Sequence, residues 1–288
     1  MGSRLACITA VLLAGLFAVP ACNKKESPPD TAPPPQNPYT GSKGGQQGDP
    51  KGPGDQQIPN PNTGGESGLP AAPTQKPLFA ATAAPQRIMS NNNLKQIGLA
   101  FHTANDVGGS FPIGIADKSG KLGLSWRVAI LPYIEQDNLY NSFKLDEPWD
   151  SEHNKKLISQ MPKTYSPPNT NTNGYTYYRS FTGAGTIMPS AAGNAGKIVN
   201  GLRINGIADG TANTLLVVEA FEPVIWTKPD ELAFDPTKPL PKVGGGMFPG
   251  GFNALLCDGS VRFMKTSIPP ATLKALITAS GGEVVDID

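Results

Sequence analysis

The sequence has few of the residues that build disulfides and metal centres. Its 288 residues include three cysteines and two histidines. Cys7 and Cys22 lie near the start of the chain, so Cys257 stands alone in the remainder and no disulfide is expected there. Neither His102 nor His153 has a second ligand three or four residues away, so the histidines indicate no metal site. A domain without disulfides or metal centres depends on burying an apolar core, and the chain is long enough to form one.

An excess of charge of either sign is also missing. The chain has 24 basic and 23 acidic residues, a net charge of +1, and no dense basic run. Nucleic acids and anionic lipid surfaces are bound through concentrated positive charge, so neither is predicted as a partner. The sequence also lacks a nucleophile elbow, a zinc signature and a phosphate-binding loop. We therefore expect no enzymatic activity and no cofactor.

The apolar run from Leu5 to Val19 is shorter than the roughly 20 residues that a bilayer requires. It follows one positive charge and closes on small residues, which is the layout of a secretory signal. Its end, VPAC, resembles the bacterial lipobox, in which the signal is cut before a cysteine that then carries lipid. We predict a lipoprotein signal peptide over 1–22 with the lipid on Cys22. The alternative is an ordinary secretory signal with an incidental cysteine.

A lipid on Cys22 predicts a protein of the cell envelope, because two or more acyl chains hold a protein on a membrane permanently. Asn23 rather than aspartate follows the cysteine, which favours the outer membrane. Residues 23–80 are rich in proline, glycine and polar residues, and Ile58 and Leu69 are the only large aliphatics before residue 78. This composition predicts a disordered tether. Its balanced charges favour a spacer over a segment that binds the cell wall.

The first half of the remaining chain shows helical periodicity. Over residues 87–105 the apolar side chains share one stripe, which predicts an amphipathic helix; they are Leu94, Ile97, Phe101 and Ala104. A second helical stretch is expected within 125–143, where Pro132 must either begin a helix or kink it. A short helix capped by Asp150 or Ser151 is expected to run to about residue 160.

The second half changes to strand periodicity. Residues 176–182 and 213–221 are rich in β-branched and aromatic side chains and are predicted strands. Residues 252–264 form two strand-like runs around Asp258-Gly259, which predicts a hairpin with a two-residue turn and positive φ at both positions. A short helix should follow the prolines at 269 and 270. Helices followed by an antiparallel sheet indicate an α+β fold.

Six motifs, in this order, resemble the bacterial family known as domain of unknown function 1559. They lie between residues about 85 and 288 and read NNNLKQIGLAFH, SWRVAILPYIEQDNLYNSFKLDEPWDSEHN, DGTANTLLVVEA, WTKPDEL, GGFNALLCDGSVRF and LKALITASGGEVV. Many members resemble type IV pseudopilins, so the resemblance implies a pilin-like head over 81–288, with the N-terminal helix and short helices packed on a small antiparallel sheet.

The chain departs from the family in two places. No prepilin segment precedes Arg87, and the membrane half of the pilin helix is replaced by the lipobox and the tether, which puts polymerisation in doubt. The CP pair that many members carry is here Ser166-Pro167, which removes a disulfide partner for Cys257. We therefore interpret Cys257 as a core residue rather than a reactive thiol.

Five residues are candidates for a binding site. Trp126, Trp149 and Trp226 would line a groove for a sugar or a peptide, although core packing is the favoured interpretation. Glu219 falls on an apolar strand face, where we expect an ion pair with Arg127 or Arg262 rather than a catalytic acid. Asp209 begins the loop 209–213, which offers oxygen ligands for calcium, but a simple turn is favoured.

These observations lead to one hypothesis and two alternatives. The leading hypothesis is a lipid-anchored envelope protein with a non-enzymatic pilin-like head that is structural or binds another envelope component. The first alternative is a solute- or glycan-binding module that uses the tryptophans and the glycine-rich loop 244–251. The second is a hydrolase centred on Glu219.

Replacing Cys22 tests the anchor. Cys22→Ser should abolish incorporation of labelled fatty acid, whereas the wild-type chain should take up label and partition into detergent, because only the cysteine accepts the lipid. Metabolic labelling followed by detergent phase separation measures both. An unlabelled, water-soluble wild-type protein whose N-terminus is not Cys22 would contradict the prediction.

Overall fold

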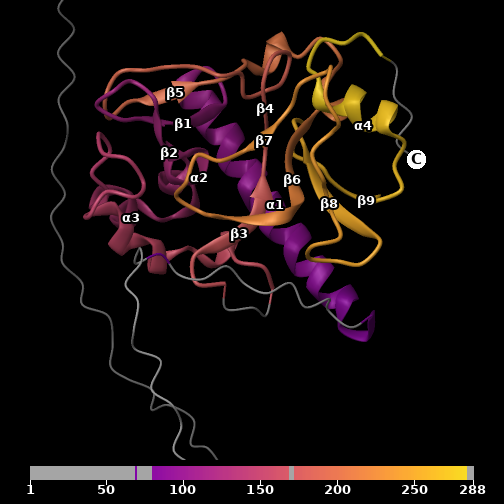
Figure 1. Cartoon of the computed structure of the whole chain (residues 1–288), viewed down its shortest axis with the longest axis horizontal. Helices are drawn as coiled ribbons and strands as arrows, with labels where there is room; N and C mark the ends of the chain where they lie inside the picture. Colours follow the sequence, from indigo (N-terminus) through magenta and orange to yellow (C-terminus); the bar gives the residue numbers. More distant parts are fainter. Residues whose placement is uncertain (1–68, 70–79, 169–171, 284–288) are drawn as a thin grey trace, which may run out of the picture. The chain divides into compact units, whose positions relative to one another are not determined.

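The computed structural model of the chain describes residues 69, 80–168 and 172–283 (Figure 1). The predicted signal peptide with Cys22 lies outside these residues, and so does nearly all of the predicted tether. Within the described ranges the chain forms helices and mainly antiparallel sheets, which confirms the α+β class. No helix in the described part is both long and apolar enough to cross a membrane.

The first element is α1, Ala80–Gly108, which begins seven residues before the predicted helix and ends three after it. Its inward stripe is the predicted one, because Leu94, Ile97 and Phe101 are fully buried and Ala104 is nearly so. The helix stops at Gly109, whose φ of 77° reverses the chain while its N–H still donates to the Asn105 carbonyl. Figure 1 shows α1 in purple alongside the large sheet.

The middle of the chain is divided into short helical turns. They are α2 (Trp126–Ala129), α3 (Asp137–Ser142) and the 3-10 turns η1 (Leu131–Ile134), η2 (Asn154–Gln160) and η3 (Lys163–Tyr165). Pro132 stands in the first turn of η1, so the proline begins a new turn instead of kinking a longer helix. The predicted helix up to residue 160 is the 3-10 helix η2.

The larger sheet has four antiparallel strands in the order β3-β6-β8-β9. Their bounds are β3 Tyr175–Arg179, β6 Leu215–Ile225, β8 Gly251–Leu256 and β9 Val261–Lys265. A three-stranded antiparallel sheet, which the sequence analysis did not predict, has the order β2-β1-β5 and consists of β1 Pro112–Ala116, β2 Leu122–Ser125 and β5 Ile198–Asn200. The short strands β4 Phe181–Thr182 and β7 Leu232–Ala233 form a parallel pair. The remaining elements are η4 Ile204–Gly206, η5 Thr211–Asn213 and α4 Pro270–Ile277.

The four-stranded sheet separates two apolar cores. On β8, Phe252, Ala254 and Leu256 belong to the core that α4 covers, and Leu255 belongs to the core that α1 covers. The alternation follows from the two-residue period of a strand. Leu69, which the sequence analysis placed in the tether, packs against the core under α1.

The predicted hairpin of β8 and β9 is present, but its predicted turn is wrong. Gly259 has a φ of 85°, whereas Asp258 does not have positive φ. The Gly259 N–H donates to the Leu256 carbonyl and the Leu256 N–H donates to the Ser260 carbonyl, so the loop has three residues, Cys257 to Gly259. This is a tight turn followed by a left-handed residue, a common hairpin connection in which one glycine suffices.

Gly259→Val should destabilise the domain because a β-branched residue is strained at positive φ by about 1–3 kcal/mol. In a domain of this size that lowers the thermal midpoint by several degrees. The matched control is Gly108→Val, since Gly108 lacks positive φ and has open space around its Cβ position. Thermal unfolding followed by circular dichroism makes the comparison. Equal midpoints for the two variants would contradict the turn described above.

Candidate functional site

A buried carboxyl group lies between α1 and the four-stranded sheet. Glu219 is at the middle of β6 and is 1% exposed. Its Oε2 accepts a hydrogen bond from the Asn253 backbone N–H at 2.7 Å, and its Oε1 accepts one from Asn253 Nδ2 at 2.9 Å. The hydroxyl of Ser90, on α1, also contacts Oε1. Three elements of the fold therefore meet at one carboxyl group.

The polar cluster continues from Ser90 to β3. The Tyr178 hydroxyl lies 2.7 Å from Ser90 Oγ, and either oxygen can donate. Asn93 Nδ2, one helical turn along α1, donates to the Tyr178 hydroxyl at 3.3 Å. Tyr178 stands opposite Glu219 in the pairing of β3 with β6. The cluster therefore satisfies polar groups that would be costly to leave unpaired in the core.

Burial raises the pKa of Glu219 to about 7, while the hydrogen bonds from Ser90 and Asn253 act in the opposite direction. The direction shows that desolvation of the charged form outweighs the three donors. At neutral pH the carboxyl is therefore near half protonation. A chain of hydroxyls from Glu219 through Ser90 to Tyr178 can reorient when the proton is gained or lost.

The predicted ion pair between Glu219 and an arginine is wrong. Arg127 is fully buried, but its Nη1 donates to Glu231 Oε1 at 2.6 Å, and Arg262 lies exposed on β9. Burial lowers the pKa of Arg127 and raises that of Glu231, and each charge opposes the effect of burial on the other. Glu231 Oε2 accepts the Ser180 N–H at 2.7 Å. This buried pair therefore joins α2 to the strand region around β4.

Two of the three candidate tryptophans lie in the core. Trp126 and Trp226 are fully buried, and Tyr165 lies between them, edge-on to Trp126 and stacked on Trp226. Their rings have no open face on which a sugar can stack. Trp149 is half-buried, with the ammonium of Lys228 5.8 Å from its ring centre. The structure therefore does not bring the three rings together in a groove.

The Asp209 carboxylate closes a loop instead of facing open space. Its Oδ2 accepts the Gly281 N–H at 2.7 Å and its Oδ1 accepts the Gly282 N–H at 2.8 Å. The Asn213 side chain donates to the Asp209 carbonyl at 3.1 Å. These contacts make residues 209–213 a structural turn that fixes the chain after α4. Among the described residues no group of three or more His, Cys, Asp or Glu side chains is placed to hold a metal ion.

His102 is part of α1, and Cys257, in the β8–β9 loop, belongs to the core that α1 covers. Cys257 is fully buried and free, and burial raises the pKa of its thiol, as expected of a core residue. His102 is half-buried, with its ring edge-on to Phe111. Its Nε2 lies 3.5 Å from the place that a Cβ on Gly259 would occupy. The hairpin tip therefore rests on α1.

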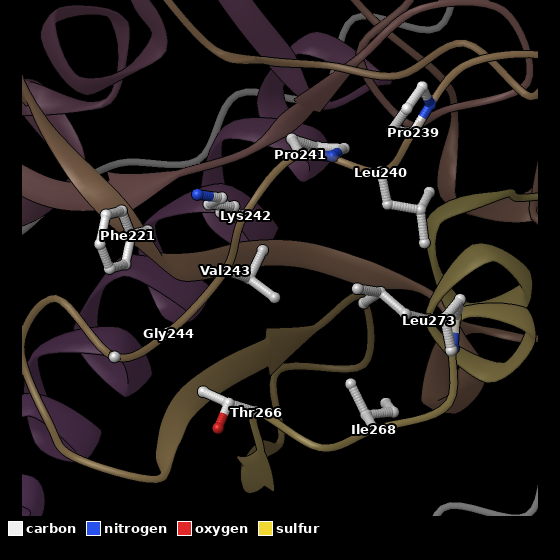
Figure 2. Close-up of a pocket in the computed structure, with 12 residues that line it drawn as sticks. Phe221, Pro239, Leu240, Pro241, Lys242, Val243, Gly244, Thr266, Ile268 and Leu273 are labelled. Carbon is white, nitrogen blue, oxygen red and sulfur yellow. The ribbon is translucent and has the colours of Figure 1, made fainter.

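An apolar groove of about 630 Å³ lies beside α4 (Figure 2). It is lined by the segment Pro239 to Gly245, by Phe221 of β6, and by Thr266, Ile268, Pro270 and Leu273. A volume of this size falls within the range of about 300–1,000 Å³ that small-molecule sites occupy. Glu219 is not among its lining residues.

Several residues of these two sites were missed by the sequence analysis. Ser90 falls on the apolar stripe of α1, four residues before Leu94, and Asn253 interrupts the apolar run of β8. A polar residue at a predicted core position is a signal that could have found both. The groove has no such signal, since it arises where residues 239–245 meet residues 266–273.

Comparison with known proteins identifies a family but no characterised relative. A family model described as "Protein of unknown function (DUF1559)" matches residues 80–245, from the start of α1 to the end of the groove segment. No curated protein and no solved structure matches the chain.

Glu219 should make the stability of the domain depend on pH. Its pKa in the folded state, about 7, exceeds its ordinary value of 4.5, so the folded state binds the proton more tightly. The stabilisation is complete below about pH 4.5 and is lost as the pH rises through 7, by about 3 kcal/mol in total. Glu219→Gln should remove this dependence. Urea unfolding of both proteins from pH 4.5 to 8 measures the difference.

The matched control is Glu222→Gln, an exposed glutamate on the same strand. It should follow the wild-type pH profile. A wild-type profile that Glu219→Gln leaves unchanged would show that this carboxyl does not titrate between the two values.

Proposed function

We propose that this chain, which belongs to the family of proteins of unknown function DUF1559, is a lipid-anchored cell-envelope protein whose pilin-like head binds a protein partner and catalyses no reaction. The resemblance of residues 19–22 to a lipobox supports the anchor, and the composition of residues 23–80 supports a spacer between anchor and head. The observation that carries the binding role is the outward face of α1.

Four of the six large hydrophobic side chains that are exposed in the described part of the chain lie on α1. They are Ile88, Met89, Leu99 and Val107. Ile88 and Leu99 are 63% and 69% exposed and stand 11 residues apart, close to three full turns. They therefore point the same way, about 16 Å apart. We call Ile88 and Leu99, with Met89 at the border of the same face, the outer row of α1.

The chemistry of the outer row favours a protein partner over a lipid surface. Asn92, Lys95 and Gln96 lie exposed between its apolar members. Interleaved polar groups pair well with the polar atoms of another protein, whereas a bilayer accepts a continuous apolar face. Exposed apolar side chains of this size mark interaction sites when several share one face.

The alternatives have less support. A glycan site built on the tryptophans requires ring faces that Trp126 and Trp226 do not offer, because both are fully buried. A hydrolase centred on Glu219 requires a carboxyl that water and substrate can reach, and this one is 1% exposed. Neither of these two objections applies to the outer row, because its side chains are exposed.

A photocrosslinking amino acid at position 92, between the members of the outer row, tests the proposal in intact envelopes. We expect one crosslinked product with another envelope protein. Ile88→Ser and Leu99→Ser should each reduce its yield, because a buried aliphatic contributes about 1.5–3 kcal/mol, roughly tenfold or more in affinity. The same crosslinker at the exposed position 222 on β6 is the control and should give no such product.

Thermal unfolding should show that both serine variants fold as the wild type does, since the replaced side chains are exposed. A crosslinked product that contains only a second copy of this chain would show that the outer row mediates self-association instead of binding another protein. Absence of any product that depends on Ile88 and Leu99 would overturn the proposal.

A further inference from the structure

The groove beside α4 is formed by a segment that continues the large sheet. β8 pairs with β6 only as far as Val218. Beyond that point Val243 pairs with Ala220: the Phe221 N–H donates to the Lys242 carbonyl at 3.3 Å, and the Gly244 N–H donates to the Glu219 carbonyl at 2.8 Å. Residues 242–244 therefore take the place of β8 beside the second half of β6. This pairing makes one wall of the groove a fixed part of the fold.

The interior of the groove is apolar. Figure 2 shows Leu240, Val243, Ile268 and Leu273 pointing toward a common space. Leu240, Val243 and Ile268 pack on the core under α4 and stay partly exposed. An apolar ligand in this space would therefore extend an existing core instead of creating a separate one. Each methylene group that the ligand buries increases its affinity about fourfold.

One cation stands at the edge of the groove. Lys242 is the single charged residue among the twelve that line it. Its Nζ lies 5.6 Å from the centre of the Phe221 ring. The ion pairs of the described residues do not include Lys242. An anionic group beside Lys242 therefore gains a charge partner without displacing another.

The walls of the groove offer few hydrogen bonds to a peptide. Pro239, Pro241 and Pro270 have no backbone N–H. The backbone N–H groups of five further lining residues already donate within the chain; they belong to Phe221, Gly244, Thr266, Ile268 and Leu273. Few backbone donors of the walls therefore remain for the carbonyl groups of a peptide, whereas an alkyl chain needs none.

We propose that this groove binds an anionic amphiphile, with its alkyl chain between Leu240, Ile268 and Leu273 and its carboxylate or phosphate head at Lys242. The apolar walls favour the chain, and Lys242, which forms no ion pair with the described residues, favours the head. The site is separate from the outer row of α1 and adds a small-molecule ligand to a protein that we propose binds a protein partner. No bond is made or broken in the ligand.

A photoreactive dodecanoate with a diazirine in its chain tests the site. The full chain is held in nanodiscs of phosphatidylcholine, irradiated with the probe and digested, and the labelled peptides are identified by mass spectrometry. We expect saturable labelling of residues 239–245 or 266–273. Dodecanoate and dodecyl phosphate should each compete, since both carry the anionic head, whereas dodecyltrimethylammonium should not.

Lys242→Glu should weaken labelling about tenfold, because attraction between exposed charges is replaced by repulsion. The matched control is Lys238→Glu in the same segment, since Lys238 is exposed and does not line the groove. It should label as the wild type does. Ile268→Trp should fill the groove and reduce labelling by the photoreactive dodecanoate at an unchanged thermal midpoint.

Three results would overturn the proposal. They are labelling that does not saturate, labelling that falls mainly outside the two segments, and labelling that Lys242→Glu and Lys238→Glu change equally. A label confined to the groove but displaced equally by dodecyltrimethylammonium would also overturn it, since the head would then make no use of the lysine. None of these results bears on crosslinking at position 92, so the two proposals fail independently.

Discussion

A carboxyl group held out of water between α1 and the large sheet is the constraint on which the rest of the domain depends. Glu219 is satisfied by groups from α1 and β8, and the same cluster reaches β3 through Ser90 and Tyr178. Apolar contacts alone would allow α1 to slide along the sheet, because they have no preferred direction. The hydrogen bond from Ser90 to this buried group fixes the register of α1, since a shift of one turn would remove that donor from the carboxyl at a cost of about 1–3 kcal/mol.

That register decides which side chains of α1 face outward. With Ser90 directed at Glu219, the opposite side of the helix carries Ile88 and Leu99. The two faces of the sheet then have different characters. The face under α1 is closed over a polar cluster, whereas the face under α4 remains partly open where Leu240 and Ile268 line the groove. The described domain therefore presents two separate surfaces.

The parts of the fold that depend on local periodicity could be predicted, and those that depend on distant contacts could not. The stripe from Leu94 to Ala104 and the β8–β9 hairpin follow from spacing within a few residues. Strand alternation placed Glu219 on the correct face, but the group across from it, Ser90, is 129 residues away, and no local pattern names it. The strands β1 and β2 escaped prediction because they are short and each contains a glycine, which breaks the alternation that marks a strand. The groove could not be predicted either, because it also arises between segments that are distant in the sequence.

The prolines at 239 and 241 have an effect on assembly. Residues 242–244 pair with β6, and the segment just before them carries two residues without a backbone N–H. An incoming strand would find missing donors there, so this border resists the edge-to-edge pairing that turns open sheets into fibres. If the proposed lipid anchor concentrates the protein on a membrane surface, crowding would otherwise favour such pairing. The prolines therefore protect only the border beside the second half of β6, since the outer strands of the sheet are β3 and β9.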